Sequence, residues 1–255
     1  MSDISLIRPD WPAPDKVVAF TTARAGGHSR APYAGFNLAD HVGDDRDAVV
    51  ANRAALSRLL PLNSALHWLT QVHGVEVLAV PQTAKQNACA DASVSRTPGH
   101  ACAVLTADCL PVLLCSRAGD VVAAAHAGWR GLLGGVLENT VAAMGVDPGQ
   151  LLAWLGPAIG PAVFEVGPEV RAAFLAAARP AHLAQTDACF VPSSSTADHY
   201  LANLYALARL RLAVLGSGSV YGGEFCTVTE KDRFFSYRRD GRTGRMASLI
   251  LIKSP

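Results

Sequence analysis

The sequence has almost no excess of charge of either sign. It holds 22 lysines and arginines against 21 aspartates and glutamates, which gives a formal net charge of +1. Proteins that bind nucleic acid or an anionic membrane surface normally concentrate basic residues in a patch. The balance therefore argues against nucleic acid and membrane partners, and it favours a small-molecule substrate.

Long apolar runs are also missing, and none approaches the roughly 20 residues that span a bilayer. The first twenty residues, MSDISLIRPDWPAPDKVVAF, contain three aspartates and three prolines where a signal peptide has a continuous apolar region. The six cysteines are irregularly spaced, so a disulfide framework is not expected. These features predict a soluble, cytoplasmic protein whose cysteines are free thiols unless a metal holds them.

No repeat, low-complexity tract or long linker divides the chain, and 50% of its residues are hydrophobic, so residues 1–255 are expected to form one domain. Strand-like runs are predicted at 17–22, 66–80, 101–115, 121–128, 151–156, 219–228 and 246–253. Helices are predicted over 46–60, over 131–144, from Pro168 onward, and along a stripe from Leu201 to Leu215 that ends at Gly216. The mixture predicts an α+β protein with more sheet than a simple βαβ repeat provides.

The segment TADCLPVLLCSRAGDVVAAAHAGWRG, residues 106–131, is typical of a hairpin whose turn is Ala118 and Gly119. Counting back from that turn pairs Pro111 with His126 and places Cys109 opposite Gly128. Cys109 and His126 then share one face as diagonal neighbours, roughly 7 to 8 Å apart at the backbone. A glycine opposite Cys109 leaves room beside the sulfur for a third group or a substrate.

His73, at the end of the apolar segment LHWLTQVHG, supplies a possible third group. Two imidazoles and one thiolate are the composition of a catalytic zinc site with one open position. Spacings of 36 and 17 residues match no compact ligand motif, however. The residues alone leave three interpretations open: buried core side chains, a Cys109 nucleophile with a histidine base, or metal ligands.

Several blocks in the chain carry a resemblance to a known family. With QVHG, TADCLPVLL and HAGWRG in this order, together with TTARAGG, NLADHVGDD, GPAIGPAVFEVG and FFSYRRDGRTGRMASLI, the sequence strongly resembles the YfiH family, also called the laccase-domain or polyphenol-oxidase-like family. The resemblance implies a single domain with four α/β/β/α layers and mixed sheets, similar to the catalytic domain of cytotoxic necrotizing factor toxins. It also implies that His73, Cys109 and His126 hold a metal, expected to be zinc.

The family resemblance further implies purine nucleoside chemistry: phosphorolysis of adenosine, inosine, guanosine and methylthioadenosine, and deamination of adenosine. Phosphorolysis needs phosphate holders, and arginines suit that role. The family blocks supply Arg24, Arg53, Arg130, Arg238, Arg239 and Arg245. Arg24 and Arg130 are favoured, because Arg24 precedes Gly26 and Gly27 and Arg130 lies at the start of a helix. Asp108 is expected to act as a base or to orient His73 or His126.

Three departures from the family pattern bear on substrate preference. His28 stands where an aliphatic residue is usual, the block DASVS occupies 91–95, and Phe164 stands where tyrosine is common.

Three rival interpretations remain. The first is a metal-free cysteine hydrolase or amidase, which would suit the family's link to peptidoglycan editing. The second is a copper polyphenol oxidase, although the chain has eight histidines and no His-X-His pair. Copper uptake by a zinc site in vitro is expected in any case. The third is a structural zinc site in which His41 is the fourth ligand.

Overall fold

The computed structural model describes residues 4–81 and 89–254, and their strands form three sheets. The five-stranded sheet has the order β1 (Leu6–Ile7), β2 (Val17–Thr22), β14 (Met246–Ile252), β6 (His100–Thr106) and β3 (Ala65–His67). The six-stranded sheet has the order β13 (Val220–Gly222), β9 (Leu151–Leu155), β7 (Leu110–Ser116), β8 (Val122–Ala127), β5 (Ala92–Ser95) and β4 (Val77–Val80). A small third sheet has the order β10 (Glu165–Val166), β12 (Tyr200–Ala202) and β11 (Phe190–Pro192). Both large sheets combine parallel and antiparallel pairs, which confirms the predicted α+β class with mixed sheets.

Seven α-helices are found in the described part of the chain. They are α1 (Arg46–Arg58), α2 (Trp129–Gly134), α3 (Val136–Met144), α4 (Pro168–Ala177), α5 (Leu183–Asp187), α6 (Leu204–Val214) and α7 (Tyr237–Asp240). Two 3₁₀ turns cover Pro148–Gln150 and Pro180–His182. None of these helices has the length and apolar character needed to span a bilayer.

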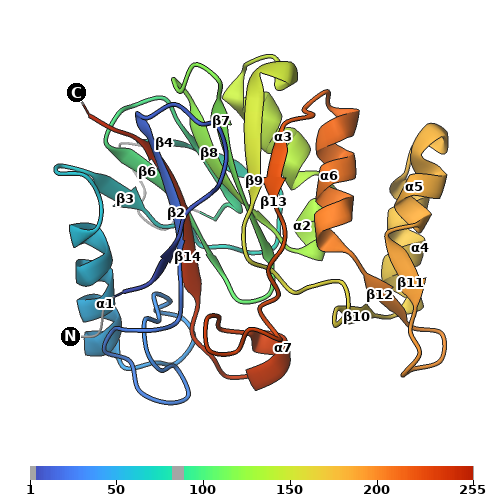
Figure 1. Cartoon of the computed structure of the whole chain (residues 1–255), viewed down its shortest axis with the longest axis horizontal. Coiled ribbons are helices and arrows are strands. Elements are labelled where there is room, and N and C mark those ends of the chain that lie inside the picture. Colours follow the sequence, from blue (N-terminus) through green and yellow to red (C-terminus); the bar gives the residue numbers. More distant parts are fainter. Residues whose placement is uncertain (1–3, 82–88, 255) are drawn as a thin grey trace.

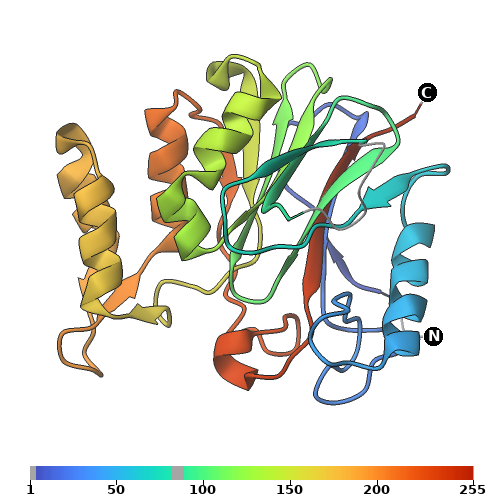
Figure 2. The same ribbon diagram turned by 180° about the vertical axis from the view of Figure 1, so that it is seen from behind.

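The two large sheets pack face to face, with helices on their outer sides (Figure 1). Alternate residues of one strand pack into different layers of the core, because successive side chains point to opposite faces of the sheet. On β7, Leu113 packs between the sheets, whereas Val112 and Leu114 pack against the layer of α2, α3 and α6. Helix α1 covers the outer face of the five-stranded sheet (Figure 2), so the strands are apolar on both faces.

The helix predictions need two corrections. Helices α1 and α4 begin where expected, at Arg46 and Pro168. The segment predicted as one helix over 131–144 is divided into α2 and α3, because Gly135 has a φ of 101°. Leu201, assigned from its spacing to the fourth helix, lies in β12, and the helix begins only after the Asn203 cap. The position of Leu201 matched the spacing of the apolar stripe of the helix only by coincidence.

Two of the predicted strand runs are each divided between the two large sheets. The run 66–80 forms β3 of one sheet and β4 of the other, and the run 101–115 likewise forms β6 and β7. The connections, 68–76 and 107–109, therefore cross from one sheet to the other. All six cysteines lie in the described residues and are free thiols.

The start of α1 gives a direct test of the local structure. Asp45 accepts hydrogen bonds from the backbone nitrogens of Asp47 at 2.8 Å and Ala48 at 3.0 Å. Replacing Asp45 with alanine leaves these donors to water, and the loss of such a cap costs about 1 kcal/mol. Urea unfolding of D45A should show that decrease in unfolding free energy. D45N keeps an acceptor oxygen and should stay close to the wild type; an equal loss in both variants would contradict the capping role.

Candidate metal site

Three side chains that are far apart in sequence gather at the crossings between the large sheets. His73 lies in connection 68–76, Cys109 in connection 107–109, and His126 on β8. Their possible ligand atoms all lie within 4.8 Å of one another, with Cys109 Sγ 3.7 Å from His73 Nε2. The two imidazoles meet edge to face, with ring centroids 4.8 Å apart. The structure therefore brings together the three residues predicted as ligands.

The predicted hairpin register is confirmed. β7 and β8 pair with Pro111 opposite His126 and Leu110 opposite Ala127. Cys109 lies just before the start of β7, so the bend after β6, and not the strand itself, sets the direction of its side chain. Asp108, with a φ of 89°, makes that bend.

A fourth residue, Asp91, fixes the orientation of His126. Its Oδ1 accepts a hydrogen bond from His126 Nδ1 at 2.8 Å, and both side chains are buried. With Nδ1 occupied in this way, the imidazole presents Nε2 to the cluster, as is usual for metal-bound histidines. Asp91 directly precedes β5, at the start of the block DASVS. The sequence did not indicate that Asp91 orients a histidine, because a single acidic residue before a short strand is common.

The same carboxylate shapes the loop that carries His73. Asp91 accepts from the backbone nitrogens of Val72 at 3.1 Å, His73 at 2.9 Å and Gly74 at 2.7 Å. These bonds replace strand pairing, which explains why His73 lies in a loop with a φ of 59° and not at the end of a strand. Burial alone would raise the pKa of Asp91, but the hydrogen bonds from His126, Gly74 and Val72 outweigh it and lower that pKa.

Cys109 and His126 form a coupled pair. Burial acts to raise the pKa of Cys109, but the nearby charge of His126 and hydrogen bonds from both imidazoles outweigh it and lower that pKa to about 6. Burial acts to lower the pKa of His126, whereas Cys109 and Asp91 raise it to about 9. The thiolate is the form that binds a metal or attacks an electrophile. A metal would have to displace the proton that the pair holds.

Gly128 keeps the sulfur accessible, as its position opposite Cys109 predicted. A Cβ at residue 128 would lie 2.9 Å from Cys109 Sγ and 3.2 Å from His73 Cδ2. The first contact is shorter than real Cβ atoms show, and the second is tighter than usual. A side chain at residue 128 would therefore displace the Cys109 sulfur and crowd the His73 ring.

The cluster opens into a cavity of about 380 Å³. Its described lining includes the three candidate ligands together with His41, Gln71, Leu105, Thr106, Ala107, Tyr237 and Arg245. Ligand-binding cavities commonly have about 300 to 1,000 Å³, so a small molecule fits beside the cluster. Arg245 Nη1 donates to the carbonyls of Thr243 at 2.9 Å and Gly244 at 3.0 Å, which hold its guanidinium in place.

The two arginines favoured from the sequence lie elsewhere. Arg24 donates to the carbonyls of Lys231 and Ala34, and the exposed Arg130 stacks on Trp129. Neither is among the described residues that line the cavity. The space near Gly27 is filled by the chain itself, because a Cβ there would lie 2.7 Å from the Gly35 carbonyl oxygen. Of the arginines in the family blocks, Arg245 is the one that lines the cavity.

Among the described residues, the Asp108 carboxylate makes no hydrogen bond to His73 or His126. It accepts from Thr227 Oγ1 and from the backbone nitrogen of Arg238, both at 2.6 Å. Asp91 is the carboxylate bonded to His126, so the prediction that Asp108 orients His126 is corrected. Its role as a base stays a prediction.

His41 lies near the cluster without joining it. It lines the cavity, but the group of potential ligands among the described residues contains His73, Cys109 and His126 without His41. The arrangement is that of an open three-ligand site and not of a closed structural site. His28 lies away from the cavity, beside the separate hollow near Asp44 and Asp45, and Phe164 is buried beneath the Arg238 guanidinium.

Comparison with known proteins agrees with the sequence blocks. The family described as multi-copper polyphenol oxidoreductase laccase matches residues 18–253. A protein from Escherichia coli (strain K12) named purine nucleoside phosphorylase YfiH is 53% identical over 247 residues, covering 97% of this chain and 98% of its own. The chain belongs to the YfiH family. A purine nucleoside phosphorylase from Pseudomonas aeruginosa is 51% identical over 247 residues, with the same coverage of 97% and 98%.

Solved structures show that the YfiH fold is shared. A Neisseria meningitidis protein matches with a TM-score of 0.90 and 48% identity, over 98% of this chain and 99% of that one. YlmD from Geobacillus stearothermophilus matches with a TM-score of 0.88 and 30% identity, over 100% of this chain and 98% of that one.

The donor set of this YfiH chain suits a zinc ion. Zinc bonds to sulfur at about 2.3 Å and to histidine nitrogen at about 2.0 Å, so two tetrahedral ligands lie roughly 3.5 Å apart. The 3.7 Å between Cys109 Sγ and His73 Nε2 fits that spacing. His126, directed by the buried Asp91, completes a set of two nitrogens and one sulfur.

Asp91→Asn tests whether that carboxylate supports the site. Asparagine cannot accept hydrogen bonds with both of its side-chain groups, so the His73 loop and the His126 ring lose part of their support. Loss of such a partner typically weakens metal binding about 10- to 100-fold. Zinc titration of the apoprotein should show this decrease. D120N, a change of the same kind at an exposed turn, should bind zinc like the wild type, and equal affinity in D91N would refute the role.

Proposed function

We propose that this chain is a zinc-dependent purine nucleoside phosphorylase with additional adenosine deaminase activity. The observation that carries the proposal is the opening of the His73, Cys109 and His126 cluster into one cavity that also holds Arg245. Relatives 53% and 51% identical over nearly the whole chain are named purine nucleoside phosphorylases. The proposed substrates are adenosine, inosine, guanosine and methylthioadenosine. The proposal treats residues 1–255 as one domain with four layers, similar to the catalytic domain of cytotoxic necrotizing factor toxins.

His73, Cys109 and His126 would hold the zinc ion. When bound there, zinc supplies a Lewis acid beside the substrate. The rest of the reaction depends on how the chain holds its substrates. Phosphorolysis places phosphate next to the anomeric carbon of the ribose and must accommodate negative charge on the departing purine.

Arg245 is the proposed phosphate holder. Its guanidinium lines the cavity and is anchored through Nη1 to two carbonyls, so it is ordered before a substrate arrives. Burial lowers the pKa of Arg245, while the negative charges of Cys109 and Asp108 act to raise it. A fixed guanidinium near the metal site would bind phosphate oxygens through two N–H donors.

Product analysis tests the proposed reaction. Zinc-loaded protein incubated with adenosine and phosphate should release adenine and ribose 1-phosphate, and without phosphate should form inosine slowly. Liquid chromatography distinguishes these products. Absence of turnover in both conditions would refute the proposal. Formation of inosine as the sole product would support the deaminase activity and refute the phosphorylase activity.

Alanine substitution of three arginines tests the phosphate site. Arg245→Ala should raise the KM for phosphate at least about tenfold, because a charge-assisted bond to phosphate contributes more than 1.4 kcal/mol. Arg24→Ala and Arg130→Ala should change it much less, since neither side chain lines the cavity. A larger effect at Arg24 or Arg130 would instead support the earlier assignment from the sequence.

The alternative reaction is hydrolysis by a metal-free Cys109 thiolate, which would suit peptidoglycan editing. The 3.7 Å contact between Cys109 Sγ and His73 Nε2 favours this second candidate, because a nucleophile and its base need such proximity. Under the zinc proposal, elemental analysis should find about one zinc per chain, and His73→Ala should lose zinc and turnover together. Full activity of the wild type in chelator would support the thiolate instead.

A multicopper oxidase would need further metal ligands. Within residues 4–81 and 89–254, the group formed by His73, Cys109 and His126 is the one set of three or more His, Cys, Asp or Glu side chains close enough to hold an ion. Binding of Cu²⁺ by this set in vitro stays a prediction, since copper competes well for nitrogen and sulfur ligands.

A further inference from the structure

A short helix contributes one side chain to the wall of the cavity. Helix α7 covers Tyr237–Asp240, and Tyr237 lines the cavity although 61% of its surface is exposed. The Arg245 guanidinium carbon lies 5.8 Å from the centroid of the Tyr237 ring. An aromatic ring that is both exposed and directed at a ligand cavity leaves area free for stacking.

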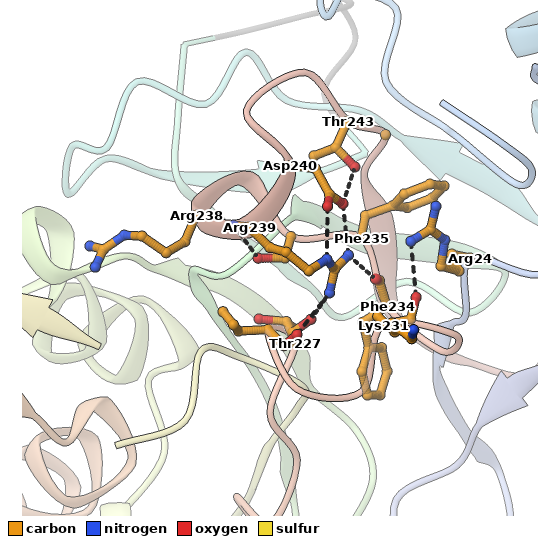
Figure 3. Close-up of polar contacts among 12 residues, drawn as sticks. Arg24, Thr227, Lys231, Phe234, Phe235, Arg238, Arg239, Asp240 and Thr243 are labelled. Carbon is orange, nitrogen blue, oxygen red and sulfur yellow. Dashed lines mark hydrogen bonds and ion pairs between the residues drawn. The ribbon is translucent and has the colours of Figure 1, made fainter. Parts of the chain in front are cut away.

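A four-residue helix cannot hold such a ring in place by its own hydrogen bonds. The helix is held by side-chain hydrogen bonds, and Arg239 within it makes most of them (Figure 3). That guanidinium donates to both oxygens of Asp240 and to the carbonyls of Thr227, Val228 and Phe234. Ser236 caps the helix by accepting from the Arg239 nitrogen at 3.2 Å.

The anchor nearest to the metal ligands is Asp108. Its carboxylate accepts from the Arg238 nitrogen, one residue beyond Tyr237, and from Thr227 Oγ1. Because Asp108 directly precedes Cys109, these bonds tie the position of α7 to the loop that carries the thiolate. Asp108 makes this connection with a φ of 89°, a backbone conformation that aspartate and asparagine tolerate better than most residues.

We propose that Tyr237 stacks on the base of the nucleoside and determines specificity for a flat heterocycle, and that Asp108 is a positioning residue that holds this ring relative to the metal ligands. The inference rests on the proposed function. The base would lie on Tyr237, the phosphate on Arg245, and the ribose between them beside the ligand cluster.

Calorimetric titration with inosine tests the stacking residue by binding, separately from turnover. Stacking on an aromatic ring changes affinity by roughly 5- to 100-fold per base, so Tyr237→Ala should weaken inosine binding to that extent. Tyr237→Phe keeps the ring and should restore the affinity. The matched control is Leu62→Ala, which removes another exposed apolar side chain away from the cavity.

Paired variants test Asp108. Asp108→Ala should weaken inosine binding about as much as Tyr237→Ala, and the double variant should be no weaker than either single one, because both changes remove the same contact. Asp108→Asn should bind inosine and turn it over at close to the wild-type rate. Asparagine can accept from the Arg238 nitrogen, donate to Thr227 Oγ1, and keep the positive φ.

The possible outcomes separate this inference from the proposed function. Unchanged inosine affinity in Tyr237→Ala overturns the stacking role. A strong loss of kcat in Asp108→Asn, with inosine binding intact, overturns the positioning role and makes Asp108 a base. If the wild type binds inosine, Tyr237→Ala weakens that binding, and the wild type still shows no phosphorolysis, the proposed reaction is refuted but the stacking role is supported. A wild type that does not bind inosine would refute both.

Discussion

The carboxylate of Asp91 accepts four hydrogen bonds, from His126 Nδ1 and from three successive backbone nitrogens of the His73 loop. It is fully buried, and a buried carboxylate is stable only when its oxygens are satisfied in this way. Asp91 thus orients His126 through a bond to its ring, and it positions His73 through bonds to the backbone of its loop. The geometry of the candidate metal site therefore depends on a buried anion that is not one of the three candidate ligands.

The placement of the site follows from how the chain passes between the sheets. His73 and Cys109 lie on two connections that cross from the five-stranded to the six-stranded sheet, and His126 lies on the strand next to β7. The strands are mainly apolar on both faces, and the three side chains meet where the two connections reach the end of β8. The cavity with Arg245 and Tyr237 lies at this end of the sandwich because their segment leads directly into β14.

Local patterns predicted the parts of this arrangement that depend on neighbouring residues. The β7–β8 register could be counted from its turn, and Gly128 could be read as an opening beside Cys109, because both follow from pairing across one hairpin. The division of 66–80 between two sheets could not be predicted, since an apolar run looks the same whichever sheet it joins. Nor could Asp91 be selected over Asp108, because its partners come from two other segments, 17 to 35 residues away. Arg245 could not be selected over Arg24 and Arg130, because the cavity joins segments that are more than 100 residues apart, such as those of Arg245 and Cys109.

The anchoring of α7 has a consequence for how molecules reach the site. Arg239 donates to three carbonyls outside the helix, and displacing the helix would leave a part-buried guanidinium and these carbonyls unpaired. The wall that carries Tyr237 therefore behaves as a rigid rim and not as a gate. Because Tyr237 on that wall is largely exposed, the cavity is in contact with solvent without any movement of the helix.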